Sequence, residues 1–220
     1  MSSLTLNAPW LEFDLGDDVQ VLSWAVHRPG LVTARRILWR EVRNADLPRD
    51  LDVHAWLTEE LRNRDAEDAV TLLTSRSIAT YTRTEARVGT AHVEAVATVG
   101  LSNAERVGAR MDRSNQNWGT INIAVLVSPG LTEAALIEAM SLAVEAKTAA
   151  ILDAALRLPV GLASGTGTDC IAVSAPSGTL NYAGKHTETG EAIGQAVYSA
   201  VRDGAEQWRI SMRERDNAAT

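Results

Sequence analysis

The residues from Gly119 to Val173 read GTINIAVLVSPGLTEAALIEAMSLAVEAKTAAILDAALRLPVGLASGTGTDCIAV. Within them, Ile121–Val127 is apolar except at Asn122 and has the length of a strand, which is typical of a strand in the middle of a sheet. The pair Pro129-Gly130 ends this strand, and Thr132 can cap the long Ala-rich helix that follows. Another apolar strand is expected at Ile171–Ala175. This strand–helix–strand order predicts an α/β domain in which Ala-rich helices pack on a mixed sheet.

The remaining sequence alternates strand and helix patterns, and 220 residues with 45% hydrophobic residues suit one core. We therefore expect a single domain over residues 1–220, with the tail after about residue 210 disordered. Ser102 followed by Glu105 forms a capping box, which predicts that a helix begins there. Other expected strands are Val19–Val26, Val70–Thr74, Ser77–Glu85 and Ala91–Val99, other expected helices are His54–Arg64 and Glu188–Arg202, and Ala34–Val42 fits either type.

A faint internal repeat runs through the chain. Thr80 matches Thr166 and Glu105 matches Glu191, both at an offset of 86 positions. The repeat favours a duplicated strand–strand–helix unit with a pseudo-twofold axis, although chance produces matches of this size equally well.

The composition excludes several classes of function. The net charge of −7 and the pI near 5.1 argue against nucleic acid as a partner, since phosphates call for a basic surface. Cys170 is the single cysteine, which excludes an internal disulfide and fits a reducing compartment. The N-terminus lacks the pattern of a signal peptide, and no apolar run is long enough to cross a bilayer. We expect a cytoplasmic enzyme or binding domain that does not contact a membrane.

The Ala-rich helix expected over Thr132–Leu156 carries one narrow polar stripe on an otherwise apolar surface. Lys147 points almost opposite to Glu145 in this stripe, because residues two apart on a helix do not face each other. The two charges therefore need different partners, unless the stripe faces water and Lys147 extends its amino group to the surface. The members of the stripe are Glu138, Ser141, Glu145 and Thr148.

Two further segments concentrate polar groups. Ser164–Asp169 combines glycines with hydroxyls and a carboxylate, which fits either a ligand-binding loop or a tight turn. Tyr182–Glu191 places Lys185 and His186 before a helix N-terminus, which favours an anionic group; a capped helix with solvated charges is the alternative. Cys170 and His186 could form a nucleophile pair, although a buried structural thiol is the commoner case. The histidines have no metal-binding spacing, so no metal site is expected.

Five short motifs, taken together, resemble the adenosylcobinamide amidohydrolase family of corrinoid salvage. The resemblance runs from about Val70 to Val201. It implies hydrolysis of the amide that joins aminopropanol to a propionyl side chain of the corrin ring, with adenosylcobyric acid as the product. The motifs are Gly100–Ala104, Gly119–Ile123, Glu145–Ala150, Gly165–Asp169 and Tyr182–Thr187.

The N-terminal third departs from the family pattern. Family members tend to have a Gly-rich turn after a serine, whereas the turn after Ser23 contains Gly30 alone. Trp39 stands where an asparagine is expected, and Thr74–Ser77 replaces a run of the Thr-Ala-Ala type. These departures fit a divergent member or a paralogue that acts on a related amide.

The resemblance favours four residues as catalytic candidates: Glu145, Lys147, Asp169 and His186. Amide hydrolysis then proceeds by attack of water, with Glu145 or Asp169 as the base, while His186 or Lys147 protonates the leaving amine. The candidates for substrate contacts are Ser102, Asn103, Asn122, Thr148, Thr166, Thr168, Thr187, Tyr182 and Trp24.

Other possibilities remain open at this point. Ser102, Thr166 or Thr168 is a rival nucleophile, activated by Lys147. The cobalt-containing corrinoid is expected as the substrate, no cofactor is expected, and the small-residue faces of the helices allow a homodimer. A corrinoid carrier without turnover and an amidohydrolase for a different amide are the alternative functions.

Overall fold

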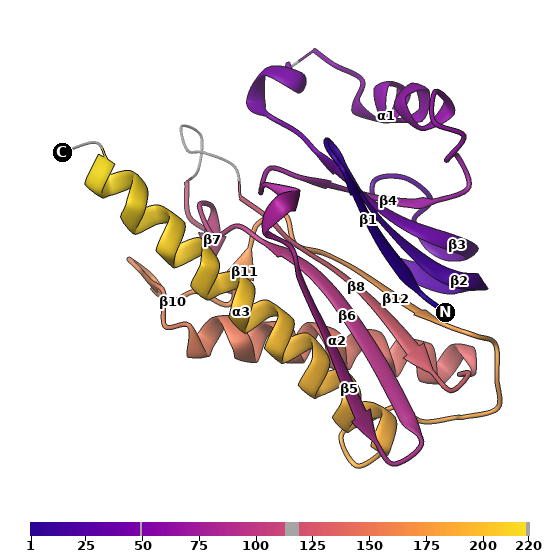
Figure 1. The fold of residues 1–220 in the computed structure, drawn as a ribbon. Coiled ribbons are helices and arrows are strands. Elements are labelled where there is room, and N and C mark those ends of the chain that lie inside the picture. Colours follow the sequence, from indigo (N-terminus) through magenta and orange to yellow (C-terminus); the bar gives the residue numbers. More distant parts are fainter. Residues whose placement is uncertain (49, 113–118, 219–220) are drawn as a thin grey trace.

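A mixed sheet forms the centre of the computed structural model, which describes residues 1–48, 50–112 and 119–218 (Figure 1). Its eight strands are β1 (Ser3–Asn7), β2 (Trp10–Ser23), β3 (Gly30–Glu41), β4 (Val70–Thr74), β5 (Thr82–Val88), β6 (Ala91–Val99), β8 (Ile121–Ser128) and β12 (Cys170–Ala175). They are hydrogen-bonded in the order β4-β3-β2-β12-β8-β6-β5, with β1 added to β2. β12 runs parallel to β8 and β4 parallel to β3, while the other neighbours are antiparallel. β8 and β12 are therefore interior strands, and β8 has the position that its sequence predicted.

Three α-helices lie against this sheet in the described part of the chain: α1 (Val53–Arg62), α2 (Glu133–Asp153) and α3 (Glu188–Ala218). α2 and α3 pack together against β5, β6, β8 and β12, whereas α1 packs at the other end of the sheet, on Trp10 of β2 and Leu38 of β3 (Figure 1). The hydroxyl of Thr132 caps α2 by accepting from the amide of Ala135 at 3.3 Å, so the predicted mixed α/β domain and this helix start are confirmed. The short elements are η1 (Asn44–Asp46), η2 (Ile78–Thr80), the ribbon of β9 (Arg157–Leu158) with β10 (Gly161–Leu162), and the ribbon of β7 (Ala104–Glu105) with β11 (Gly165–Thr166).

The two faces of the sheet are buried in different ways. One face packs on α2 and α3 through alternating residues of β6 and β8, such as Val93. On the other face, Val96 and Ala124 share a core cluster with Phe13 of β2. Because strands that are far apart in the sheet order share this core, the sheet curls over on itself. A hollow lies at each end of the curl, one beside the start of β8 and the other beside its end.

The segment Ser102–Glu105 is not helical, so the capping-box prediction is wrong. It forms a turn followed by β7, whose residues pair with Gly165–Thr166 of β11. The carbonyl of Glu105 accepts from the amide of Ser164 at 2.8 Å. A segment that is distant in sequence thus satisfies this backbone, where the local pattern indicated a helical turn.

Helix α3 is longer than the sequence indicated. The tail was expected to be disordered after about residue 210, whereas α3 continues through Ala218. Trp208 packs against the main core, and Arg76 donates to the hydroxyl of Ser211 at 3.2 Å. These contacts with distant segments favour the helical extension. The last residues, 219–220, lie outside the described part of the chain.

The structure does not show the duplicated unit. Glu105 lies in β7, whereas Glu191 lies near the start of α3. Thr80 belongs to η2, whereas Thr166 belongs to β11. Residues that match at the constant offset therefore adopt different secondary structures.

Two glycines on the first turns of α3 test how closely this helix packs against the loop that precedes it. A Cβ at Gly190 would lie 2.0 Å from the carbonyl oxygen of Gly184, whereas a Cβ at Gly194 would meet nothing within 4 Å. Gly190→Ala is expected to destabilise the protein by about 1–3 kcal/mol, because the backbone must shift. Gly194→Ala is expected to stabilise it by up to about 1 kcal/mol through helix propensity. Chemical denaturation measures both; equal effects would contradict this account.

Candidate active site

A buried ion pair joins α2 to the loop before β12. The amino group of Lys147 lies 2.7 Å from Oδ2 of Asp169, and the two side chains are only 9% and 13% exposed. Lys147 also donates to the carbonyl oxygen of Ser164 at 3.3 Å. Lys147 thus points into the protein. Moving two charged groups out of water is costly, so each buried charge must be stabilised by its partner.

The Gly165–Asp169 loop wraps around the carboxylate of Asp169. Its Oδ1 accepts from the amide of Thr166 at 2.9 Å and from the hydroxyl of Thr166 at 2.5 Å. A Cβ at Gly165 would lie 2.3 Å from Oδ2 of Asp169 and 2.6 Å from the amino group of Lys147. A glycine is therefore needed for the loop to approach the ion pair this closely.

Hydrogen bonds tie this loop to the start of β8. The hydroxyl of Thr168 donates to the carbonyl of Gly119 at 2.9 Å, and the side-chain amide of Asn103 donates to that hydroxyl at 3.3 Å. The hydroxyl of Thr120 donates to the carbonyl of Thr168 at 2.7 Å and lies 3.2 Å from Oδ1 of Asn122. The loop is thus held in a single arrangement beside the sheet.

Two asparagines at this end of the sheet differ in their pairing. Asn122 is fully buried, and its side-chain amide donates to the carbonyl of Leu73 at 2.6 Å. That bond joins β8 to β4 across the curl. Oδ1 of Asn103 is also buried but has no hydrogen-bond partner within the described residues. Such an unpaired acceptor is uncommon in a folded protein and is frequently associated with function.

A pocket of about 440 Å³ opens beside this network. Trp24 stands at its rim, 49% exposed, with its indole nitrogen donating to the carbonyl of Asp169 at 2.8 Å. The polar side of the pocket comes from β8 and the Gly165–Asp169 loop, and the opposite side is apolar. The polar lining includes Thr120, Asn122, Thr168 and Asp169, and the apolar lining is Val26, Val42, Leu47, Leu72 and Leu73.

Cys170 also lines this pocket but is a poor nucleophile. Burial raises the pKa of its thiol to about 12, and the nearby charge of Asp169 adds to this effect. The thiol is therefore protonated at neutral pH, and the thiolate is the reactive form. His186 does not line the pocket, so the structure does not assemble the Cys170–His186 pair that the sequence left open.

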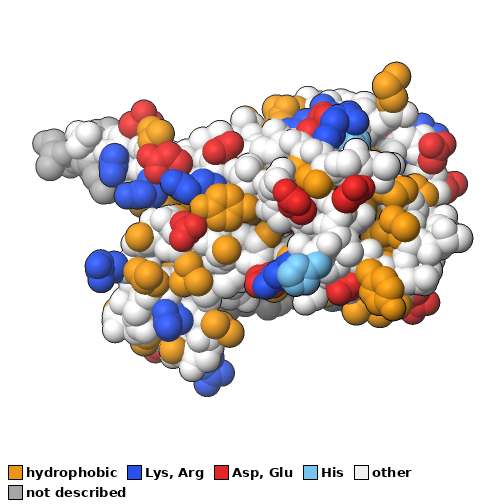
Figure 2. Space-filling model, turned by 90° about the horizontal axis from the view of Figure 1, so that it is seen from below, with side chains coloured by type: hydrophobic (Ala, Val, Ile, Leu, Met, Phe, Trp, Pro, Cys, Tyr) orange, Lys and Arg blue, Asp and Glu red, His pale blue; other side chains and the backbone are white. Residues whose placement is uncertain are grey.

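The other polar candidates lie on a separate surface. Glu145 forms an ion pair with Lys185, and both line an open groove between α2 and α3. His186 and Tyr182 are exposed on the loop beside that groove. On the underside of the molecule, where α2 lies in Figure 1, hydrophobic side chains are scattered among charged ones (Figure 2). Glu145, Asp169 and His186 were all predicted as catalytic candidates, but the structure does not bring them together in one pocket.

The remaining candidates on this side have local roles. The hydroxyl of Thr187 donates to the carbonyl of Gly184 at 2.8 Å and accepts from the amide of Gly190 at 2.9 Å, which caps α3. Glu138 accepts from the amide of Ala183 at 2.7 Å. The polar stripe of α2 thus holds the loop before α3, and Thr148 lies half-buried on the same helix.

Sequence reasoning missed two parts of the pocket. The first is its apolar side, which comes from the N-terminal third, where the family motifs were absent. The second is Thr120, which lies within a quoted motif and whose hydroxyl donates to the carbonyl of Thr168 in the Gly165–Asp169 loop. The available signal was a threonine directly before the mostly apolar run Ile121–Val127.

Two features are absent from the described residues. No group of three or more His, Cys, Asp or Glu side chains is placed to hold a metal ion. No helix is long and apolar enough to span a membrane.

Comparison with known proteins assigns the chain to a family. The family model for adenosylcobinamide amidohydrolases matches residues 2–212. The chain belongs to this family. The match includes the N-terminal third, so the departures there are variation within the family.

Two relatives agree with this placement. An adenosylcobinamide amidohydrolase of Methanosarcina mazei is 32% identical over 126 residues, which are 52% of this chain and 57% of that protein. An uncharacterized protein of Methanocaldococcus jannaschii is 39% identical over 87 residues, which are 38% of this chain and 34% of that protein. The matched segments therefore span about a third to just over half of these relatives' lengths.

Proposed function

We propose that this protein hydrolyses the aminopropanol amide of adenosylcobinamide and so releases adenosylcobyric acid. Family membership supports the reaction class. The observation that carries the assignment of the site is the buried Lys147–Asp169 pair at the edge of a pocket of about 440 Å³. Buried, paired ionisable groups in a cleft are more frequent at active sites than elsewhere.

In the proposed mechanism Asp169 is the base. It accepts a proton from water as the oxygen attacks the amide carbonyl, and the C–N bond then breaks as the amine takes up a proton. Lys147 holds the carboxylate in place at 2.7 Å, and it is the donor that we assign to the leaving amine. Gly167 belongs to the pocket lining, and its backbone amide is the donor that we assign to the oxyanion.

Thr166 is the alternative nucleophile, because its hydroxyl already donates to Asp169 at 2.5 Å. In that route the threonine oxygen forms an ester with the propionyl arm, the amine leaves, and water then hydrolyses the ester. Thr166→Val separates the two routes. It abolishes turnover if the hydroxyl attacks, and leaves measurable turnover if water attacks.

The size of the pocket indicates how the substrate binds. Its volume is near the lower end of the range for small-molecule sites, so it suits one side arm of a corrinoid and not the whole ring. The ring then lies outside, with its apolar edge against Trp24 and the apolar side of the pocket.

Incubation with adenosylcobinamide tests the proposal directly. We expect adenosylcobyric acid and free aminopropanol to appear in equal amounts, measured by mass spectrometry. Simple N-alkyl propionamides serve as competitors. Binding of adenosylcobinamide without any product would support a corrinoid carrier, and faster hydrolysis of the simple amides would support a different substrate.

A further inference from the structure

The pocket beside Asp169, which we call the first pocket, lies where two distant strands of the curled sheet meet. Its apolar side includes Leu72 and Leu73 of β4, and its polar side includes Thr120 and Asn122 at the start of β8. β3, β2 and β12 stand between β4 and β8 in the order of the sheet. The two sides of the pocket therefore belong to strands that are not hydrogen-bonded neighbours.

A short hydrogen bond joins these two strands across the curl. The side-chain amide of Asn122 donates to the carbonyl oxygen of Leu73 at 2.6 Å, and Oδ1 of Asn122 lies 3.2 Å from the hydroxyl of Thr120. Asn122 is fully buried, so both ends of its side-chain amide are engaged within the protein. Loss of this donor would leave the carbonyl of Leu73 without its partner, which is costly for a buried group.

The carbonyl of Leu73 lies on the edge of β4 that faces away from β3. On the same edge, the backbone of Thr71 exchanges two hydrogen bonds with that of His27, at 3.2 and 3.3 Å. The hydroxyl of Thr98 on β6 reaches the hydroxyl of Thr74 at 3.4 Å, which is long for such a bond. The bond to the carbonyl of Leu73 is the shortest of these links, and it lies at the pocket.

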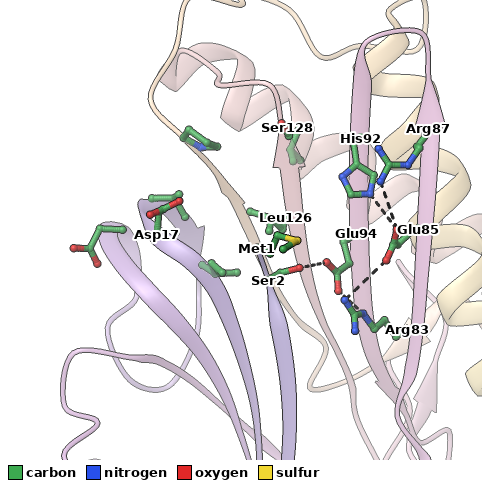
Figure 3. Close-up of a pocket in the computed structure, with 15 residues that line it drawn as sticks. Met1, Ser2, Asp17, Arg83, Glu85, Arg87, His92, Glu94, Leu126 and Ser128 are labelled. Carbon is green, nitrogen blue, oxygen red and sulfur yellow. Dashed lines mark hydrogen bonds and ion pairs between the residues drawn. The ribbon is translucent and has the colours of Figure 1, made fainter.

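The other end of the curl has a comparable link (Figure 3). A second pocket, of about 570 Å³, lies there. The hydroxyl of Ser2, just before β1, donates at 2.6 Å to the carboxylate of Glu94 on β6, which is only 2% exposed and also pairs with Arg83. Because β1 pairs with β2 and not with β6, this bond also joins strands that are not neighbours. Each end of the curl thus has one short side-chain hydrogen bond across it.

We propose that Asn122 is a positioning residue that sets the width of the first pocket. This proposal rests on the proposed hydrolysis taking place there. Without the bond from Asn122, the edge of β4 is free to move away with Leu72 and Leu73, so that only part of the population has a closed pocket. The apparent affinity for the substrate then falls by that fraction. The bonds of the Lys147–Asp169 pair do not involve β4, so the chemical step is preserved.

Asn122→Leu tests the proposal, because leucine is of similar size and cannot donate. Hydrogen exchange, followed by mass spectrometry, should become faster in peptides that cover β4 and stay unchanged in those that cover α2. KM for adenosylcobinamide should rise about threefold to tenfold, which corresponds to the loss of one hydrogen bond. The value of kcat should stay close to that of the unmodified protein. Asn122→Ser, with a shorter side chain, serves if the leucine variant does not fold.

Ser2→Ala is the matched control, because it removes the short bond at the other end of the curl. It should change neither KM nor the exchange of β4. A raised KM without faster exchange in β4 would make Asn122 a direct substrate contact and contradict the proposal. Faster exchange with an unchanged KM, or a loss confined to kcat, would also contradict it. Absence of turnover by the unmodified protein refutes the proposed function alone, and the exchange of β4 then still decides whether Asn122 holds this wall.

Discussion

Asp169→Asn is expected to lower kcat for the hydrolysis of adenosylcobinamide by about 10²–10⁴-fold. The substitution removes the proposed base, and general acid–base catalysis contributes a factor of this size. It keeps the shape of the side chain and its bond from the amide of Thr166. Binding of adenosylcobinamide should persist, because the pocket lining is otherwise unchanged. Steady-state kinetics, corrected for the folded fraction by circular dichroism, measure the effect.

Glu145→Gln is the matched control for this prediction. Both changes replace a carboxylate by its amide, and both residues belong to motifs that resemble the family. Glu145 pairs with Lys185 at the α2–α3 groove and does not line the first pocket. Its variant should therefore retain turnover close to that of the unmodified protein. The reverse outcome, with an inactive Glu145 variant and an active Asp169 variant, would move the reaction to the groove.

Lys147→Met is the second substitution with a large expected effect. It should destabilise the protein by about 3–5 kcal/mol. It leaves the carboxylate of Asp169 mostly buried without its counter-charge. The double variant with Asp169→Asn should be clearly more stable than the sum of the two single changes predicts, because neither charge is then left alone. Urea denaturation of all four proteins measures this coupling.

Lys185→Met provides the comparison for that cycle. Its partner Glu145 and Lys185 itself are largely solvent-exposed, so loss of this pair should cost less than about 1 kcal/mol. Additive effects at Lys147 and Asp169 would show that the buried pair is not a unit. The account of the candidate site would then lose its physical basis.

The sequence predicted the centre of the fold because that part depends on local patterns. The apolar run of β8, the cap at Thr132 and the Ala-rich helix all occur within a few residues of one another. The segment Ser102–Glu105 was mispredicted because its hydrogen bonds go to β11, which lies far along the chain. The curl of the sheet was equally invisible, since it depends on contacts of β2 and β3 with β6 and β8.

The candidate site was predictable only where it depends on local helical geometry. Helical geometry alone separated Lys147 from Glu145, and the structure places them on different sides of α2. The partner of each residue could not be predicted, because it depends on where the loops before β12 and α3 lie. Glu145 and Lys147, which belong to one motif, were therefore assigned to one site, whereas α2 contributes to two.

A crystal structure of the Asp169→Asn variant with adenosylcobinamide tests the central claim most directly. The account predicts the aminopropanol amide inside the first pocket, within reach of residue 169, with the corrin ring outside against Trp24. Density for the amide arm in the groove between Glu145 and Lys185, with the first pocket empty, would contradict it.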